Sequence, residues 1–124
     1  MLKMRTVTNE NERESFAKIY GLEKEKGLNL YLAENRGEVL GVCFYRFIDE
    51  GMEILYADAD DDDALFDGLI RAAMAALFDC EKDKVVFSKA IDRQTLQKYR
   101  FITGDELCIK SANVFFQTCK NCKN

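Results

Sequence analysis

The strongest constraint on the fold is an amphipathic segment enclosed by two apolar ones. In residues 61–80, apolar side chains recur three and four positions apart, which is the spacing of one helix face. The stretches 52–59 and 84–91 on either side are short and apolar, as buried strands are. A strand, helix and strand in this order pair the two strands in parallel through a right-handed crossover. The chain therefore predicts a layered fold in which this helix lies against a sheet.

The segments around this unit predict further elements. In chain order they are a strand at 3–7, a helix begun by Thr8 or Asn9 and ended by Gly21 or Gly27, strands at 28–35 and 39–47, a short helix at 93–100 begun by Asp92, and one or two strands within 106–119. Strands 28–35, 39–47 and 52–59 follow one another through short turns and should pair antiparallel. The fold class is α/β (α+β): one domain over residues 1–124, with a mixed, mainly antiparallel twisted sheet flanked by helices. Residues 119–124 are expected to form a loose tail.

Composition excludes several classes of function. The 124 residues carry a formal charge of −4, so the long-range attraction that a nucleic-acid partner requires is missing. The polar start and the absence of any apolar run of about 18 residues predict no membrane contact and a cytoplasmic protein. The chain has no histidine, which removes Ser-His and Cys-His nucleophile pairs and the commonest metal ligand.

The five cysteines are an odd number without regular spacing, and we expect them to be reduced. Cys119 and Cys122 have CxxC spacing, but no histidine and no second such pair completes a zinc site. An exposed, oxidisable tail is the simpler interpretation. We expect no bound metal there.

Three segments of the chain resemble the GNAT superfamily of N-acetyltransferases. GEVLGVCFYRF is similar to the family's hairpin strand, and TLQKYRF is similar to its late LYEKLGF segment. ILYADADDDDALFDGLIRAAMAAL is similar to the strand, pyrophosphate loop and long helix of its acyl-CoA motif. The resemblance implies a GNAT-like fold of order β-α-β-β-β-α-β-α-β(β), with acetyl-CoA or another acyl-CoA as cofactor. It also implies a small-molecule amine or a protein as the acceptor.

The resemblance also implies a cofactor-binding site. Main-chain N–H groups at the start of the long helix would hold the pyrophosphate, and the exposed main chain near Tyr56 and Ala57 would bind the thioester. The implied cofactor-binding residues are Tyr56, Ala57, Asp61, Asp62, Asp63, Ala64, Leu65 and Phe66. Three of them depart from the family pattern R/Q-x-x-G-x-G/A: Asp61 at the first position, Ala64 at the first glycine and Phe66 at the second small residue.

Carboxylates surround the expected pyrophosphate position. They belong to Asp58, Asp60, Asp61, Asp62 and Asp63. A unit charge pair near 5 Å at an effective dielectric of about 20 is worth roughly 3 kcal/mol, less where solvent is near, so the run should repel a phosphate. Helix capping explains the run without a ligand. Recognition of a cationic partner and divalent metal binding are alternatives, but Asp63 and Leu69 occupy the places of the glycine and glutamate of an EF-hand loop.

Two catalytic residues follow from the same resemblance. Glu53 on the 52–59 strand would act as the base that activates the amine, and Tyr99 would protonate the thiolate. Leu96 occupies the position where the family often has that tyrosine. The alternative for Glu53 is an ordinary solvated strand residue.

Two functions remain open at this point. The first is a GNAT-like acetyltransferase-fold protein of unknown substrate, with an atypical acidic cofactor loop and weak, unconventional or lost acyl-CoA-dependent N-acyltransferase activity. The second is a non-catalytic module on the same fold that binds a small ligand or a protein, or forms a homodimer through its sheet. Fold analogy alone does not decide between them.

Overall fold

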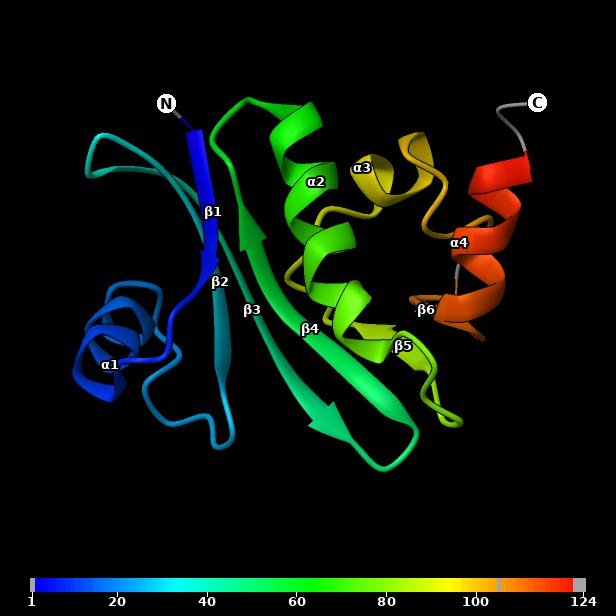
Figure 1. The fold of residues 1–124 in the computed structure, drawn as a ribbon, viewed down its shortest axis with the longest axis horizontal. Helices are drawn as coiled ribbons and strands as arrows, with labels where there is room; N and C mark the ends of the chain where they lie inside the picture. Colours follow the sequence, from blue (N-terminus) through cyan, green and yellow to red (C-terminus); the bar gives the residue numbers. More distant parts are fainter. Residues whose placement is uncertain (1, 105, 122–124) are drawn as a thin grey trace.

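A six-stranded sheet organises the molecule, and its strands lie side by side in chain order (Figure 1). The computed structural model describes residues 2–104 and 106–121. The strands are β1 (Leu2–Thr6), β2 (Asn29–Asn35), β3 (Glu38–Ile48), β4 (Gly51–Asp58), β5 (Lys84–Phe87) and β6 (Cys108–Ile109). Neighbouring strands pair antiparallel, except that β4 and β5 pair in parallel. The predicted mixed, mainly antiparallel sheet and the predicted parallel pair are both confirmed.

Helices cover both faces of this sheet. They are α1 (Glu10–Ile19), α2 (Asp63–Met74) with the 3-10 turn η1 (Ala75–Leu77), α3 (Arg93–Lys98) and α4 (Ala112–Asn121). In Figure 1, α2, α3 and α4 lie together to one side of the sheet and α1 lies to the other. None of the helices in the described part of the chain has the length and apolar character needed to traverse a bilayer.

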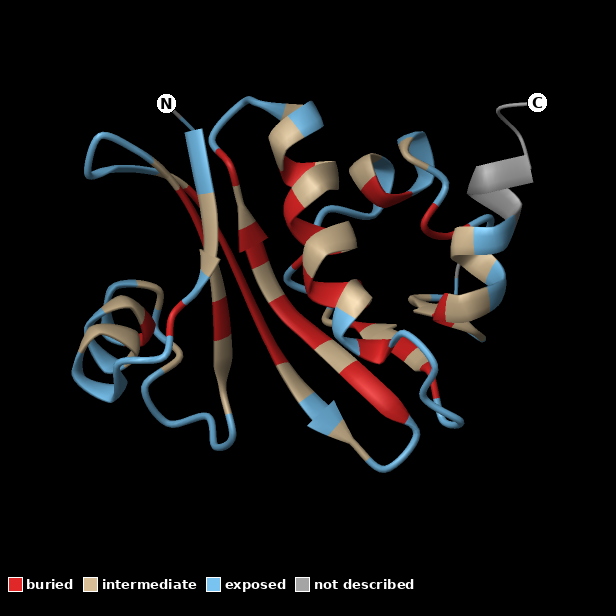
Figure 2. Ribbon diagram, viewed as in Figure 1, coloured by how far each residue is buried: buried red, intermediate tan, exposed pale blue. Residues whose placement is uncertain are grey.

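Alternating side chains of the central strands divide between two hydrophobic cores. On β3, Cys43 and Tyr45 join the larger core under α2, whereas Val42 and Phe44 join the smaller core on the α1 side. All four are buried. Figure 2 shows buried positions running along β3, β4 and α2. The period of two that predicted the strands therefore also separates the two cores.

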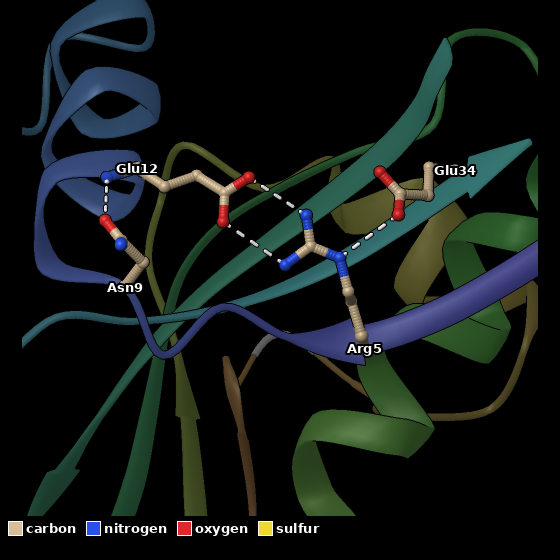
Figure 3. A network of polar contacts seen from close by, with 4 residues as sticks. All are labelled: Arg5, Asn9, Glu12 and Glu34. Carbon is tan, nitrogen blue, oxygen red and sulfur yellow. Dashed lines mark hydrogen bonds and ion pairs between the residues drawn. The ribbon is translucent and has the colours of Figure 1, made fainter. Parts of the chain in front are cut away.

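Polar contacts hold α1 against the first two strands. Asn9 begins the helix, because its side-chain oxygen accepts a hydrogen bond from the Glu12 amide at 2.9 Å. Arg5 on β1 donates to both carboxylate oxygens of Glu12 and to Glu34 on β2, over 2.9–3.2 Å (Figure 3). These hydrogen bonds, with Glu12 first, raise the pKa of Arg5 above its ordinary value. Arg5 thus fixes the start of α1 relative to β1 and β2.

A glycine in β3 lets α2 lie directly on the sheet. A Cβ at Gly41 would lie 2.7 Å from Leu69 Cδ1 of α2 and 3.0 Å from the Asp58 carbonyl oxygen at the end of β4. A larger residue at position 41 would therefore require the Leu69 side chain to move and would press against the Asp58 carbonyl oxygen. Gly41 therefore sets how closely α2 approaches the end of β4, where the candidate site lies.

The C-terminal segment corrects one prediction. The strands expected within 106–119 reduce to the two residues of β6, and α4 begins at Ala112. Ser111 starts this helix, because its hydroxyl accepts a hydrogen bond from the Val114 amide at 3.2 Å. Ala112 and Phe115, three positions apart, both pack against the larger core. A short apolar run does not by itself separate strand from helix, and here the polar cap decides for the helix.

Other element boundaries also differ from the predictions. The helix expected over 61–80 begins at Asp63 and changes to η1 after Met74. The strand expected over 84–91 ends at Phe87, because Ser88 and Ile91 form a turn. Residues 119–121, which the sequence places in a loose tail, belong to the backbone of α4. The CxxC pair cannot be placed as a pair, since Cys122 lies outside the described residues.

Candidate functional site

The sheet opens between β4 and β5, because the two strands pair over only half of β4. Parallel pairing joins 51–54 of β4 to 84–87 of β5, and the Ser88 amide then donates to the Ile54 carbonyl oxygen at 2.9 Å. Residues 56–58 of β4 pair only with β3 among the strand pairs that the structure describes. The main chain at Tyr56 and Ala57, which the resemblance assigns to the thioester, therefore lies in the half of β4 that is not paired with β5.

A β-bulge marks the same point on β4. Phe44 of β3 lies opposite Tyr56 and Tyr45 lies opposite Ile54, so Leu55 is an extra residue on β4. The bulge breaks the alternation, and both Leu55 and Tyr56 pack with the smaller core on the α1 side. It also bends β4 at the place where β4 and β5 separate.

Tyr56 lies beside Tyr20, the residue that ends α1. Their ring centroids are 5.3 Å apart. Burial, followed by the nearby Asp58 carboxylate, raises the pKa of both tyrosines above the ordinary value, and both hydroxyls are protonated at neutral pH. The α1 side of the opening thus carries an aromatic pair next to a carboxylate.

The loop between β4 and α2 is closed by its own hydrogen bonds. The Asp62 side chain caps α2 by accepting from the Leu65 amide at 3.0 Å, and the Asp62 amide donates to the Ala59 carbonyl oxygen at 3.0 Å. The Asp60 amide donates to the Asp58 carboxylate at 3.1 Å. Asp60 has a φ of +51°, a left-handed conformation that aspartate tolerates better than most residues. The acidic run is therefore a capped turn, as its simplest interpretation predicted.

Two main-chain amides near the start of α2 are already hydrogen-bonded within the chain. The Leu65 amide is bonded to Asp62, and the Phe66 amide donates to the Asp62 carbonyl oxygen at 3.0 Å. The Phe66 side chain is 9% exposed and packs in the larger core, so its size does not obstruct the loop. Ala64 is exposed. The departure from the family pattern at this loop is therefore one of charge and hydrogen bonding rather than of bulk.

The charge of the loop is only partly compensated. Lys98 of α3 donates to the Asp63 carboxylate at 2.8 Å. In the described part of the chain, no cation forms an ion pair with any of the other four loop aspartates. Within those same residues, no three acidic or thiol side chains are placed so that they could share a metal ion. The loop and the hollow beside Leu40 therefore form a negative surface at the N-terminus of α2.

Glu53 is engaged in an ion-pair chain. Its carboxylate accepts hydrogen bonds from Arg46 of β3 at 2.7 Å, and Arg46 also donates to Glu25 at 3.0 Å. The hydrogen bond with Glu53 is the main reason why the pKa of Arg46 is raised. Met52 and Ile54 point into the larger core, so Glu53 between them faces the α1 side. The carboxylate to which the resemblance gives the role of base is held as the partner of a guanidinium.

Tyr99 lies on the other side of the sheet. It ends α3, packs partly against the larger core, and has the Lys98 ammonium 5.5 Å from its ring centroid. Leu96, at the alternative tyrosine position, is fully buried in that core. The structure therefore does not bring Glu53 and Tyr99 together on one face.

Sequence reasoning missed Arg46 and Glu25. The hairpin register could have found Arg46: the tight turn pairs Ile48 with Gly51, which places Arg46 opposite Glu53. The contact with Glu25 has no such signal, because Glu25 lies in the irregular segment between α1 and β2. Its position depends on how that segment packs.

Comparisons with known proteins agree on the fold and leave the activity open. No protein-family model matches the sequence, and a search of curated proteins finds no significant match. Among solved structures, ribosomal-protein-alanine N-acetyltransferase from Brucella melitensis biovar Abortus 2308 superposes with a TM-score of 0.61 at 13% identity, covering 85% of this chain and 94% of that one. The E. coli protein YhhK bound to coenzyme A gives 0.62 at 11% identity, covering 90% and 98%. The aminoglycoside acetyltransferase meta-AAC0020, from an uncultured soil metagenomic sample, gives 0.60 at 14% identity, covering 85% and 90%.

These structures are similar to the chain over nearly its whole length. The chain therefore has a GNAT-like fold, as its sequence segments indicated. At this level of identity the likeness concerns the fold alone.

Proposed function

We propose that this chain is an acetyltransferase-like protein whose acyl-CoA site keeps its outline but has changed its chemistry, so that conventional acyl-CoA-dependent N-acyl transfer is weak or lost. One observation carries the proposal. The Asp62 carboxylate occupies the Leu65 amide at the start of α2, inside a loop with four further aspartates. The Leu65 amide is therefore occupied, and the favourable charge that a pyrophosphate requires is missing.

The residues of this loop do not fit a pyrophosphate in the usual way. A phosphate at the N-terminus of α2 would have to displace Asp62 from Leu65 and would remain close to the other carboxylates. Each carboxylate within about 5 Å opposes the phosphate by roughly 3 kcal/mol at an effective dielectric of about 20, less with solvent between them. Lys98 is the nearest described cation bonded to the loop, and it already pairs with Asp63.

The second candidate is a non-catalytic module that binds a ligand or a protein on the same fold. The contact between Glu53 and Arg46 favours it, since one oxygen of that carboxylate is already bonded to a guanidinium at 2.7 Å. The placement of Tyr99 away from Glu53 favours it as well. We expect the two candidates to differ in whether any acyl-CoA is bound and turned over.

A thermal-shift titration separates these outcomes. The thermal midpoint of the purified chain is measured with acetyl-CoA and CoA, and with a nucleotide of equal charge as the control. A ligand at 100 times its dissociation constant adds about 2.7 kcal/mol, which raises the midpoint of a domain of this size by several degrees. We expect no specific shift at millimolar acetyl-CoA. A saturable shift specific to CoA compounds would contradict the proposal and would justify a screen of amine acceptors.

A charge-neutralised variant tests the reason for weak binding. Asp60→Asn, Asp61→Asn and Asp62→Ser together remove three negative charges, while Asn tolerates the φ of residue 60 and Ser keeps the cap at residue 62. We expect this variant to gain a CoA-specific shift. The matched control changes three exposed carboxylates elsewhere, with Glu23→Gln, Glu38→Gln and Glu81→Gln. An equal gain in the control would show that only net charge matters.

A further inference from the structure

Strand β1 forms one edge of the sheet, with β2 on one side and no described strand on the other (Figure 1). The Val7 amide, just after β1, donates to the Leu30 carbonyl oxygen at 2.8 Å and continues the register of the two strands. Main-chain groups point alternately to the two sides of an antiparallel strand. The N–H and C=O groups of Leu2, Met4 and Thr6 therefore point away from β2, towards the open side.

The side chains of β1 divide between the two faces of the sheet. Leu2 and Met4 lie on the α2 side, where Met4 packs against the larger core and Leu2 is 51% exposed. Lys3 and Arg5 lie on the α1 side, since Arg5 bonds to α1. An open edge strand with exposed apolar surface is a template for pairing with another chain, unless its charges prevent it. The charges on the α1 side therefore decide what can pair with β1.

These charges are arranged as a cation beside an anionic cluster. Arg5 donates to Glu12 at 2.9 and 3.2 Å and to Glu34 at 3.1 Å, as Figure 3 shows. One guanidinium and two carboxylates leave this cluster with a single negative charge. Lys3 is exposed and forms no ion pair with any residue that the structure describes. The edge thus carries an unused cation two positions from an anionic cluster.

We propose that β1 pairs antiparallel with β1 of a second copy of this chain, around a two-fold axis at Met4. Met4 then exchanges main-chain hydrogen bonds with the partner's Met4, and Leu2 exchanges them with the partner's Thr6. The two sheets become one continuous sheet, and the exposed Leu2 side chain is covered. The proposal goes beyond the proposed function, because it involves neither the acidic loop nor the opening between β4 and β5.

Charge complementarity selects a second copy and this register. Lys3 lies opposite the partner's Arg5, so its ammonium can reach the carboxylates that this guanidinium holds. Two-fold symmetry repeats the contact, and each unused cation meets an anionic cluster. An axis at Lys3 would bring two ammonium groups together, and an axis at Arg5 would bring two anionic clusters together. The axis at Met4 avoids both repulsions.

The first test is sedimentation velocity of the full chain at concentrations from about 5 to about 500 µM. A single pair of strands buries little surface, so we expect a weak dimer with a dissociation constant of tens to hundreds of micromolar, by order of magnitude. The weight-average mass should rise with concentration from that of one chain towards that of two. The mass of one chain at every concentration overturns the proposal.

Amide hydrogen exchange locates the contact. The amides of Lys3 and Arg5 point to β2 and should be protected at low and high concentration alike. The amides of Met4 and Thr6 point to the open side, and they should become protected only as the dimer forms. A rise in mass without protection of Met4 and Thr6 places the contact elsewhere and overturns the proposal.

Charge variants test the register. Lys3→Glu sets a carboxylate against the partner's anionic cluster at both symmetric contacts, and it should raise the dissociation constant about ten-fold or more. Lys3→Arg keeps the cation and should associate as the wild type does. Lys89→Glu is the matched control, because Lys89 is exposed after β5 and its replacement changes the net charge equally. Equal weakening by Lys3→Glu and Lys89→Glu overturns the register. Since no CoA compound is present, failure of this proposal is distinct from failure of the proposed function.

Discussion

Two aspartates cap helices in the same chemical way and in opposite surroundings. Asp62 is exposed and accepts one hydrogen bond, from the Leu65 amide at 3.0 Å. Asp83, before β5, is 9% exposed and accepts three from the start of α4. These come from the Ser111 hydroxyl at 2.8 Å and from the amide and side-chain nitrogens of Asn113 at 2.9 and 2.6 Å.

This difference predicts that removing the Asp83 carboxylate costs more stability than removing the Asp62 carboxylate. If Asp83 is removed, three half-buried donors lose their acceptor, and water reaches them only in part. If Asp62 is removed, its exposed donor turns to water at a small cost. We therefore expect changes in the acidic loop to cost less stability than changes at the attachment of α4.

The largest effect is expected for Asp83→Ala. The change leaves the Ser111 hydroxyl and two nitrogens of Asn113 without their acceptor, so we expect the free energy of unfolding to fall by about 2–4 kcal/mol. Urea denaturation of the variant and the wild type measures the loss. Asp61→Ala is the control, because Asp61 is exposed and caps nothing. A loss below about 0.5 kcal/mol for Asp83→Ala, which is typical of surface changes, would show that Asp83 is no more important for stability than an exposed aspartate.

The pH dependence of stability gives the next contrast. Burial alone would raise the pKa of Asp83, but the hydrogen bonds from Asn113 and Ser111 outweigh it and hold the pKa below the ordinary 3.8. The contribution of a group with a lowered pKa is present above the unfolded value of 3.8 and is lost as the pH falls through the lower folded value. We expect the advantage of the wild type over Asp83→Asn to be constant above about pH 5 and to shrink in acid. Urea midpoints of both proteins, measured from acid to neutral pH, check this. A stability difference that grows as the pH falls would contradict the prediction.

Much of the fold could be predicted, because local patterns decide it. The helical spacing of Leu69 and Ala73 and the apolar strands on either side predicted the crossover unit. Asp92 was correctly identified as a cap, and Asn9 was one of the two caps predicted for the first helix. The C-terminal helix was missed because a short apolar run fits a strand and a helix alike, and because part of what holds its first turn is remote. Asp83 lies 30 positions from Asn113, and no local pattern shows that contact.

The candidate site was less predictable for the same reason. The bulge at Leu55 moves one side chain out of alternation, and a period of two cannot reveal it. The sequence placed Glu53 and Tyr99 in one site, but the structure puts them on opposite faces of the sheet. Their catalytic roles stay predictions. The acidic character of the loop, by contrast, was visible in the sequence, since charge depends on composition alone.

A smaller effect is expected at the exposed cap. Asp62→Ala removes the bond to Leu65, and we expect a loss of about 1 kcal/mol in the free energy of unfolding, as for other N-caps. Asp62→Ser keeps a side-chain acceptor and should restore most of this loss. Urea denaturation of both variants measures the pair. A loss as large as that of Asp83→Ala would erase the distinction between the two aspartates.

The smallest effect on stability is expected for the ion pair between Asp63 and Lys98. Breaking this pair from either side tests how the charges of the acidic loop affect anion binding. Both side chains are well exposed, at 45% and 61%, so Lys98→Gln and Asp63→Asn should each leave the thermal midpoint within about 2 °C of the wild type. Their effects on anion binding should differ. Asp63→Asn removes a repelling charge and frees the Lys98 ammonium. Asp63 raises the pKa of Lys98 above its ordinary value of 10.5 through its hydrogen bond and its charge, so Lys98 remains cationic at neutral pH even when Asp63 is lost. Lys98→Gln removes the cation and leaves all five carboxylates in place. In a thermal-shift titration with CoA, the midpoint of Asp63→Asn should therefore rise more than that of Lys98→Gln. An equal rise in the two variants would show that the charges of this loop do not govern what binds at the N-terminus of α2.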